Sequence, residues 1–356
     1  MPGGRPPLPG DSVILGYSTL FAADAVEHAL ADADSARKLL LQRRPDLVPR
    51  IEAVVARITH GAGDSRHANA ALLGLARLGL RHGGFGDDPH DYHNEDHVME
   101  LAERRLGRVL DGQGDDILPT NDALALLLFA ACHDLRQREA RDVPGPVGGN
   151  EAASIAETFR ILDVCGFQRG PDRDQYVALE LMIAGSTFDP RPLPHPEGEA
   201  MASVAGGSLA RGLGLWLDGE RPQWAADAAT RRGERLGRLA SDLDTANVGE
   251  PFPLLAQSAL RLCRERERRA GRSLGDAASG PACLGFLSRG QLNYFFELHR
   301  FCSREGDRVF GPTKLANGEA VRRVSAALLG RFEGRVPASG QAVLDAFEAL
   351  CADDVG

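Results

Sequence analysis

Residues 123–134 read ALALLLFAACHD, an apolar run that ends in a histidine and an aspartate. The apolar part is shorter than the roughly 20 residues of a membrane span, so it predicts a helix buried in a protein core. An imidazole and a carboxylate buried at its end, those of His133 and Asp134, are costly without partners. A divalent metal ion is a suitable partner, because it binds neutral imidazole and ionised carboxylate. The run therefore predicts a metal site at the end of a core helix.

Upstream of this run, residues 92–97 read YHNEDH. His93 and His97 are four residues apart, so on a helix their imidazoles lie on one face, one turn from each other. Far downstream, residues 241–247 read SDLDTAN and offer a further carboxylate. Asp242 and Asp244 point about 200° apart on one helix, so only one of them can face the histidines. The three segments together predict one polar centre built from distant parts of the chain.

Helical periodicity recurs along the rest of the chain, and strand alternation does not. Helices are expected at 92–111, 120–136, 150–165, 172–187, 223–247, 253–271 and 285–304, with three more in 18–80 and one or two in 319–352. Residues 82–91 and the Pro/Gly-rich stretch 188–222 are expected to be loops. The pattern predicts an all-α bundle with an N-terminal helical segment (1–80), a main domain (81–310) and a C-terminal helical tail (311–356).

The composition is that of an ordinary globular protein, with 43% apolar and 26% charged residues. A net charge of −9 makes nucleic acid an unfavourable partner, because long-range attraction to phosphate is lacking. The six cysteines form no CxxC pair, which is typical of reduced thiols in the cytosol. Neither a secretory signal nor a membrane span is expected, so the predicted location is the cytoplasm. The sequence does not decide whether the chain forms a homodimer.

The order of these motifs resembles that of the HD-domain metal-dependent phosphohydrolase superfamily. Tyr-His-Asn-x-x-His, then His-Asp on a buried helix and then a distant Asp is most similar to the branch of cyclic-nucleotide phosphodiesterases. The resemblance covers residues 90–305 and implies an all-α HD-type bundle that hydrolyses a small-molecule phosphoester. It implies divalent metal ions as cofactors, two of them, drawn from Zn, Mn, Mg, Fe or Co.

The resemblance also implies roles for individual residues. His93 would be the general acid that protonates the leaving oxygen. The metal ligands would be His97, His133, Asp134 and Asp242, with Asp134 bridging two ions. Asp242 is favoured over Asp244 because it precedes a leucine, as the ligand does in the family's Ala-Asp-Leu motifs. The expected substrate-binding residues are Tyr92, Asn94, Gln291 and Tyr294.

Several points stay open in the sequence. Val143 stands where the phosphodiesterases carry the histidine of His-Pro-Gly, and either Glu151 or Asp142 could orient His93. Arg136, Arg138 and Arg141 could take the extra phosphates of a nucleoside triphosphate or an alarmone, which gives an alternative hydrolase. A metal-bound sensor without turnover is a further alternative, although such a protein needs no proton donor. The charged run 264–269 is expected to be an exposed helix face.

Overall fold

The computed structural model describes residues 16–112, 118–139, 141–143, 145–189 and 207–353. The first half of the chain contains α1 (Ala25–Ala29), α2 (Ala33–Arg43), α3 (Leu47–Ile58), α4 (Ser65–His82), α5 (Glu95–Met99), α6 (Leu106–Asp111), α7 (Thr120–Cys132), α8 (Gly149–Val164) and α9 (Arg173–Ser186). The second half contains α10 (Leu213–Glu220), α11 (Ala228–Thr245), α12 (Phe252–Arg269), α13 (Ser279–Gly285), α14 (Gln291–Asn293), α15 (Arg304–Arg331) and α16 (Gly340–Asp353). Short 3-10 turns lie at Tyr17–Thr19, Leu209–Arg211, Trp224–Ala226 and Ala246–Gly249, and π-helical turns at Glu100–Arg105, Phe286–Gly290 and Tyr294–Leu298. The predicted all-α fold is confirmed.

Within the described residues, the one sheet is a pairing of two short strands, β1 (Phe188–Asp189) and β2 (Gly207–Ser208). The pair is antiparallel, and both strands lie within residues 188–222, which were expected to form a loop. Part of that stretch, residues 190–206, lies outside the described residues. The expectation of a loop throughout 188–222 is corrected at its C-terminal end, where α10 is helical. Leu213 and Leu217, one turn apart on α10, are buried against α9 and α11 and so hold this helix in place.

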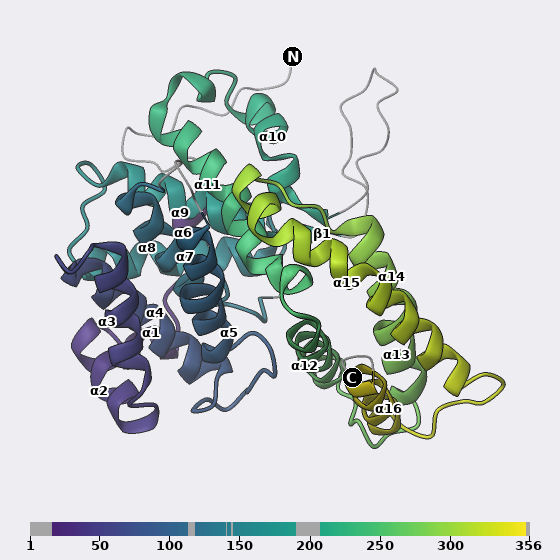
Figure 1. Cartoon of the computed structure of the whole chain (residues 1–356). Helices are drawn as coiled ribbons and strands as arrows, with labels where there is room; N and C mark the ends of the chain where they lie inside the picture. Colours follow the sequence, from purple (N-terminus) through teal and green to yellow (C-terminus); the bar gives the residue numbers. More distant parts are fainter. Residues whose placement is uncertain (1–15, 113–117, 140, 144, 190–206, 354–356) are drawn as a thin grey trace, which may run out of the picture.

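The helices form two packed groups (Figure 1). The larger group contains α1 to α9 and α11 around one hydrophobic core, and the smaller group contains α12, α13, α15 and α16 around a second core. The run quoted first forms α7, whose residues from Asp122 to Cys132 are all buried, as the sequence predicts. Helix α4 lies unusually close to it, because a Cβ on Gly74 would come within 2.8 Å of the Ala131 carbonyl oxygen. The end of α7, which leads directly to His133 and Asp134, is therefore packed tightly against α4.

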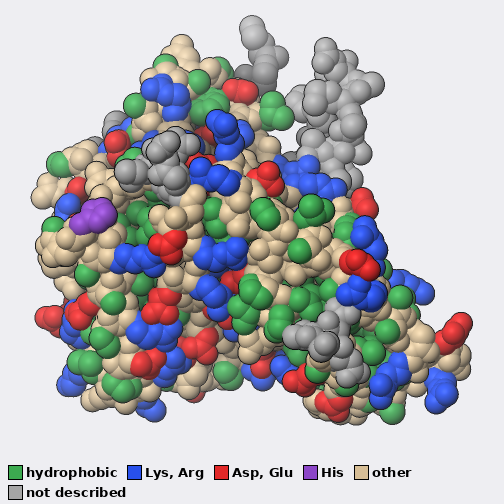
Figure 2. All heavy atoms as spheres, in the orientation of Figure 1, with side chains coloured by type: hydrophobic (Ala, Val, Ile, Leu, Met, Phe, Trp, Pro, Cys, Tyr) green, Lys and Arg blue, Asp and Glu red, His purple; other side chains and the backbone are tan. Residues whose placement is uncertain are grey.

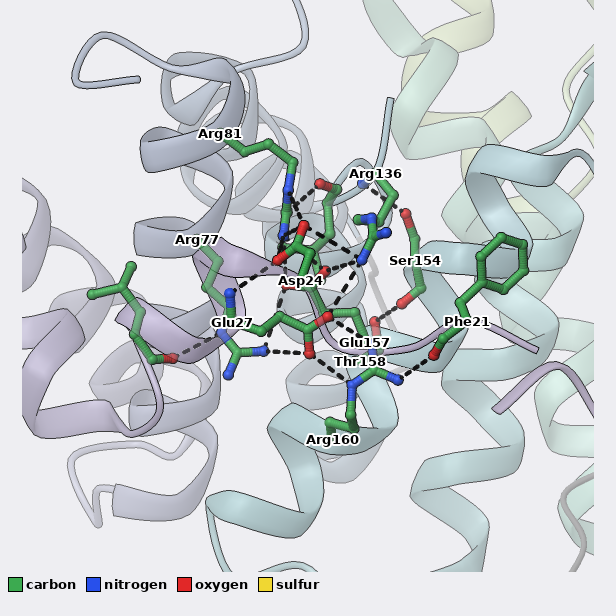
Figure 3. Close-up of polar contacts among 12 residues, drawn as sticks. Phe21, Asp24, Glu27, Arg77, Arg81, Arg136, Ser154, Glu157, Thr158 and Arg160 are labelled. Atoms are coloured by element: carbon green, nitrogen blue, oxygen red, sulfur yellow. Dashed lines mark hydrogen bonds and ion pairs between the residues drawn. The ribbon is translucent and has the colours of Figure 1, made fainter. Parts of the chain in front are cut away.

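The N-terminal helices are part of the larger group. Residues from Tyr17 onward belong to the same buried core as α7 and α9. A buried polar network also ties them to α8 (Figure 3): Arg160 contacts Glu27 at 2.6 Å, and Arg77 pairs with both Glu27 and Glu157. The expected boundary at residue 80 therefore does not coincide with a change of core.

The expected boundary at residue 311 is corrected, because it falls inside α15. This helix begins at Ser303, whose hydroxyl accepts a hydrogen bond from the Gly306 amide, as a helix cap does. Upstream, helical structure runs without a break from Ser279 to Leu298 and passes through two π-helical turns. The C-terminal tail is thus continuous with the main body.

No helix among the described residues is long and apolar enough to cross a membrane. Figure 2 shows acidic and basic side chains interspersed over the face it displays.

Candidate metal centre and its proton donor

His133 and Asp134 follow directly on α7. The Nδ1 atom of His133 lies 3.1 Å from the Phe129 carbonyl oxygen, so that nitrogen donates its proton to the helix. The Nε2 atom is thereby left with a free lone pair, and it lies 3.0 Å from Asp134 Oδ2. The end of the apolar helix thus presents one imidazole and one carboxylate side by side.

His97 reaches the same point from α5. Asn94 starts this helix, because its side-chain oxygen accepts hydrogen bonds from the amides of Asp96 and His97. The Nε2 atom of His97 lies 3.8 Å from Asp134 Oδ2, and its Nδ1 atom lies 3.8 Å from Glu100 Oε2. A carboxylate behind an imidazole, as Glu100 is here, orients the ring of a metal-ligating histidine.

The carboxylate that joins them is that of Asp244, and the expectation of Asp242 is corrected. Asp244 Oδ1 lies 3.2 Å from His97 Nε2 and 3.4 Å from His133 Nε2. Asp242 instead faces the start of α15, where it accepts hydrogen bonds from the amides of Cys302 and Ser303 and from the Ser303 hydroxyl. The helix places the two aspartates on opposite faces, so the choice depends on what packs against each face.

Arg105 holds the chain at Asp244. This arginine is fully buried in the π-helical turn Glu100–Arg105, and its guanidinium donates to the carbonyl oxygens of Leu243 and Asp244 at 2.9 and 2.6 Å. Glu250 balances its charge from 3.4 Å away. The end of α11 is therefore fixed relative to the helix that carries His97.

The four side chains have the properties of a metal site. Among the described residues, His133 Nε2 and Asp134 Oδ2 are buried and have no hydrogen-bond partner. Such atoms are costly unless another group binds them. Two imidazole nitrogens and two carboxylates suit a divalent ion such as zinc, manganese or iron. His97, His133, Asp134 and Asp244 could thus hold the metal.

His93 lies beside this cluster, with its ring centre 6.0 Å from that of His97. Its Nδ1 atom lies 2.6 Å from Glu265 Oε1, and Glu265 Oε2 accepts hydrogen bonds from the amides of Tyr92 and His93. Glu265 therefore fixes both the ring and its backbone. Neither Glu151 nor Asp142 makes this contact, so the alternatives left open by the sequence are replaced by Glu265 from α12.

The carboxylates control the protonation of the imidazoles. Burial works to lower the pKa of His93, but the charge of Asp134 and the hydrogen bond to Glu265 outweigh it and raise the pKa to about 9. Burial likewise works to raise the pKa of Asp244, and the adjacent imidazoles of His133 and His97 overcome it and hold the pKa well below its usual range. The site thus combines ionised carboxylates with an imidazole that retains its proton at neutral pH.

The four residues expected to bind substrate have different surroundings. Tyr92 is buried with its ring 4.4 Å from that of His97, and both polar groups of the Asn94 side chain bond to the backbone. Gln291 lines a small apolar cavity beside Phe252 on the face of α12. Tyr294 is half-buried, and its ring packs against those of Phe188 and His299, with centres 5.8 and 5.7 Å away.

Glu265 was missed because it lies in the charged run 264–269, which the sequence presents as an exposed helix face. The run is in fact mixed: Glu265 and Glu267 are buried, whereas Arg266, Arg268 and Arg269 are exposed. A weak signal existed, since Glu265 follows the buried Leu255 and Ser258 at helical spacing. Periodicity can indicate such burial but cannot name the partner of the buried carboxylate.

The arginines that could take extra phosphates are engaged within the protein. Arg136 contacts Glu139 at 2.5 Å, and Arg141 donates to the Leu20 carbonyl oxygen at 2.6 Å. Arg138 donates to Asp88 at 2.8 Å. All three guanidinium groups therefore already have partners within the protein.

The fold is that of phosphodiesterase domains. The structure of LmjPDEB1 in complex with IBMX superposes with a TM-score of 0.50 and 16% identity, over 88% of this chain and 99% of that chain. The phosphodiesterase domain of the rhodopsin phosphodiesterase of Salpingoeca rosetta gives a TM-score of 0.50 and 13% identity, over 91% of this chain and 99% of that chain. No family model and no curated protein sequence matches the chain.

Proposed function

We propose that this chain is a divalent-metal-dependent phosphohydrolase whose substrate is a phosphodiester of the cyclic-nucleotide type. The observation that carries the proposal is the convergence of His97, His133, Asp134 and Asp244, with the proton-bearing His93 beside them. Divalent ions in such a site lower the pKa of water and neutralise phosphoryl oxygens, which is the chemistry that hydrolysis of a phosphodiester needs.

The residues of the chain supply the remaining steps. The two metal-facing imidazoles offer Nε2 lone pairs, and the two carboxylates offer negative charge. His93 keeps its Nδ1 proton on Glu265, so its Nε2 is the atom that gives a proton to the leaving alkoxide. Glu265 stays ionised, because the hydrogen bonds from the two imidazoles His90 and His93 overcome burial and lower its pKa.

The likeness in fold favours a phosphodiester over a nucleoside triphosphate. Both similar structures are of phosphodiesterases, and one of them holds the small molecule IBMX. The internal pairing of Arg136 and Arg138 leaves fewer free cations for a triphosphate. Tyr294 is our candidate for contact with the base of the nucleotide, because its ring packs against His299, whose Nε2 lies 3.1 Å from the hydroxyl of Thr245, the neighbour of Asp244.

The test combines metal analysis with an assay of hydrolysis. The purified protein is supplied with Mn²⁺ or Mg²⁺ and given cAMP, cGMP, nucleoside mono- and triphosphates, ppGpp and an aryl phosphodiester. We expect turnover of a cyclic nucleotide that His93→Ala lowers by about 10²–10⁴-fold while the bound metal stays. His28→Ala, at an exposed histidine, is the matched control and keeps full activity.

Three results would count against the proposal. Bound metal without turnover of any compound in the panel would leave a sensor or a different substrate class. Full activity of His93→Ala would remove the proton donor from the mechanism. Preferred hydrolysis of ppGpp or a triphosphate would replace the phosphodiester by the alternative substrate class.

A further inference from the structure

We infer that His82, Asp88 and His90 form a further divalent-metal site, of the zinc type, that shares no ligand with the first cluster. His82 is the last residue of α4, and the other two lie in the loop that leads to α5. The loop folds back on the helix, because the His90 amide donates to the His82 carbonyl oxygen at 2.7 Å. The two imidazole rings consequently lie with their centres 4.3 Å apart.

The distances between the three side chains fit ligands around one ion. Asp88 Oδ2 lies 3.3 Å from His90 Nε2 and 3.5 Å from His82 Nδ1. Both distances are longer than the roughly 2.7–3.2 Å that is typical of an N–H···O hydrogen bond. Tetrahedral zinc with bonds of about 2.0–2.1 Å separates its ligand atoms by about 3.3–3.4 Å. The spacing is therefore closer to that of ligands than to that of hydrogen-bonded partners.

The surroundings supply what a metal-bound histidine needs. His90 Nδ1 lies 3.4 Å from Glu265 Oε1, so a metal on Nε2 leaves the ring proton facing a carboxylate. His82 and His90 are both buried, whereas the Asp88 side chain is 38% exposed and gives an ion access from solvent. Burial, helped by the neighbouring His90, lowers the pKa of His82 to about 3, so its ring is neutral as a ligand must be. Arg138 pairs with both oxygens of Asp88, so an ion bound at Oδ2 shares this oxygen with the guanidinium or displaces it.

Binding of the ion has a consequence for the first cluster. His82 Nε2 accepts a hydrogen bond from the Gln137 amide at 3.2 Å, and the Gln137 side chain donates to Asp134 Oδ1 at 2.5 Å. A metal on His82 Nδ1 moves the ring proton to Nε2, so the bond from Gln137 must be given up. On the other side, the ion fixes His90 and with it Glu265, which orients His93. The two sites are thereby connected through both the metal ligand and the proton donor.

The test counts zinc ions after equilibrium dialysis at a buffered free zinc concentration, with protein-bound metal measured by mass spectrometry. We expect Asp88→Asn/His90→Gln to bind one zinc ion fewer than the wild-type protein. His97→Ala/His133→Ala, which disrupts the first cluster, is expected to keep one ion. His67→Gln is the matched control, because His67 is also a buried histidine beside an aspartate, Asp64, at 2.9 Å, and its count stays that of the wild type.

The inference is overturned if Asp88→Asn/His90→Gln binds as many zinc ions as the wild type, or if the variant of the first cluster binds none. If the variant of the first cluster fails to fold, the test is made with cobalt in place of zinc, on the wild type and on His90→Gln. The d–d absorption of bound Co²⁺ is expected to be weaker in His90→Gln than in the wild type by the contribution of one ion, and equal spectra would also overturn the inference. Neither count depends on hydrolysis, so an inactive protein with an intact second site would refute only the proposed function.

Discussion

At the scale of single residues, the site depends on which of two aspartates faces the histidines. Asp242 and Asp244 are separated by one residue and have the same chemistry, yet one binds the chain just before α15 and the other contacts two imidazoles. Burial raises the pKa of Asp242 to about 7 although three hydrogen bonds favour its ionised form. Position on the helix thus gives one carboxylate a structural contact and makes the other our candidate metal ligand.

This difference predicts opposite results for two matched substitutions. Asp244→Asn is expected to lose bound metal with little change in the free energy of unfolding of the metal-free protein. Asp242→Asn is expected to keep the metal and to lower that free energy by about 1–3 kcal/mol, because the amides of Cys302 and Ser303 lose a carboxylate acceptor. Metal analysis and urea unfolding of both variants check the pair, and the reverse pattern would restore Asp242 as the ligand.

The dyad of His93 and Glu265 gives a prediction on pH. His93 must be protonated to donate, so activity falls as the pH rises through the pKa of this imidazole. Glu265→Gln removes a negative charge that raises this pKa, so the fall is expected to begin at lower pH and kcat to decrease. Glu267→Gln, at a buried glutamate on the same helix that pairs with Arg272, is the control with an unchanged profile. An unshifted profile in Glu265→Gln would contradict the dyad.

At the scale of helices, the close contact of α4 with α7 positions the ligands. A Cβ at Gly74 would lie 2.8 Å from the Ala131 carbonyl oxygen and 2.9 Å from Cys132 Sγ, directly before His133. Neither atom is the end of a flexible side chain on the surface, so the helices must separate to admit a methyl group. The glycine therefore sets the distance between the two helices.

Gly74→Ala is expected to lower the free energy of unfolding by about 1–3 kcal/mol through overpacking. It should also weaken metal binding, because His133 and Asp134 move with the end of α7. Gly330→Ala, at a helical glycine whose Cβ would meet open space, is the control and is expected to stabilise by roughly 0.4–1 kcal/mol. Thermal unfolding and metal analysis of both variants test this prediction. If Gly74→Ala were as stable as the wild type, α4 and α7 could move apart at no cost in free energy.

At the scale of the whole molecule, buried charged side chains join the N-terminal helices to the rest of the larger helical group. Arg77 and Glu157 are almost fully buried, and their partners come from α1, α4 and α8 (Figure 3). Arg81 links this network to the chain next to Asp134, because its guanidinium donates a hydrogen bond to the Leu135 carbonyl oxygen at 2.5 Å. The buried network of the N-terminal helices thus reaches the chain directly beside Asp134.

Removal of one member of this network is expected to leave a buried charge without its partner. Glu157→Leu should lower the free energy of unfolding by about 3–5 kcal/mol. Glu52→Leu, which breaks the exposed pair with Arg37 at 2.7 Å, should change it by about 0–1 kcal/mol. We expect one unfolding transition in both variants, because residues 17–80 share the main core; a separate early transition would show that the segment folds on its own.

The sequence by itself determined the all-α fold, the buried α7 and the group of His93, His97, His133 and Asp134. These follow from local properties, namely the period of apolar residues and the cost of burying polar groups at the end of an apolar helix. Only the tertiary structure decided between Asp242 and Asp244, and it alone revealed Glu265 as the partner of His93. Both depend on which helix packs against a given face, and the period of one helix carries no information about its neighbours.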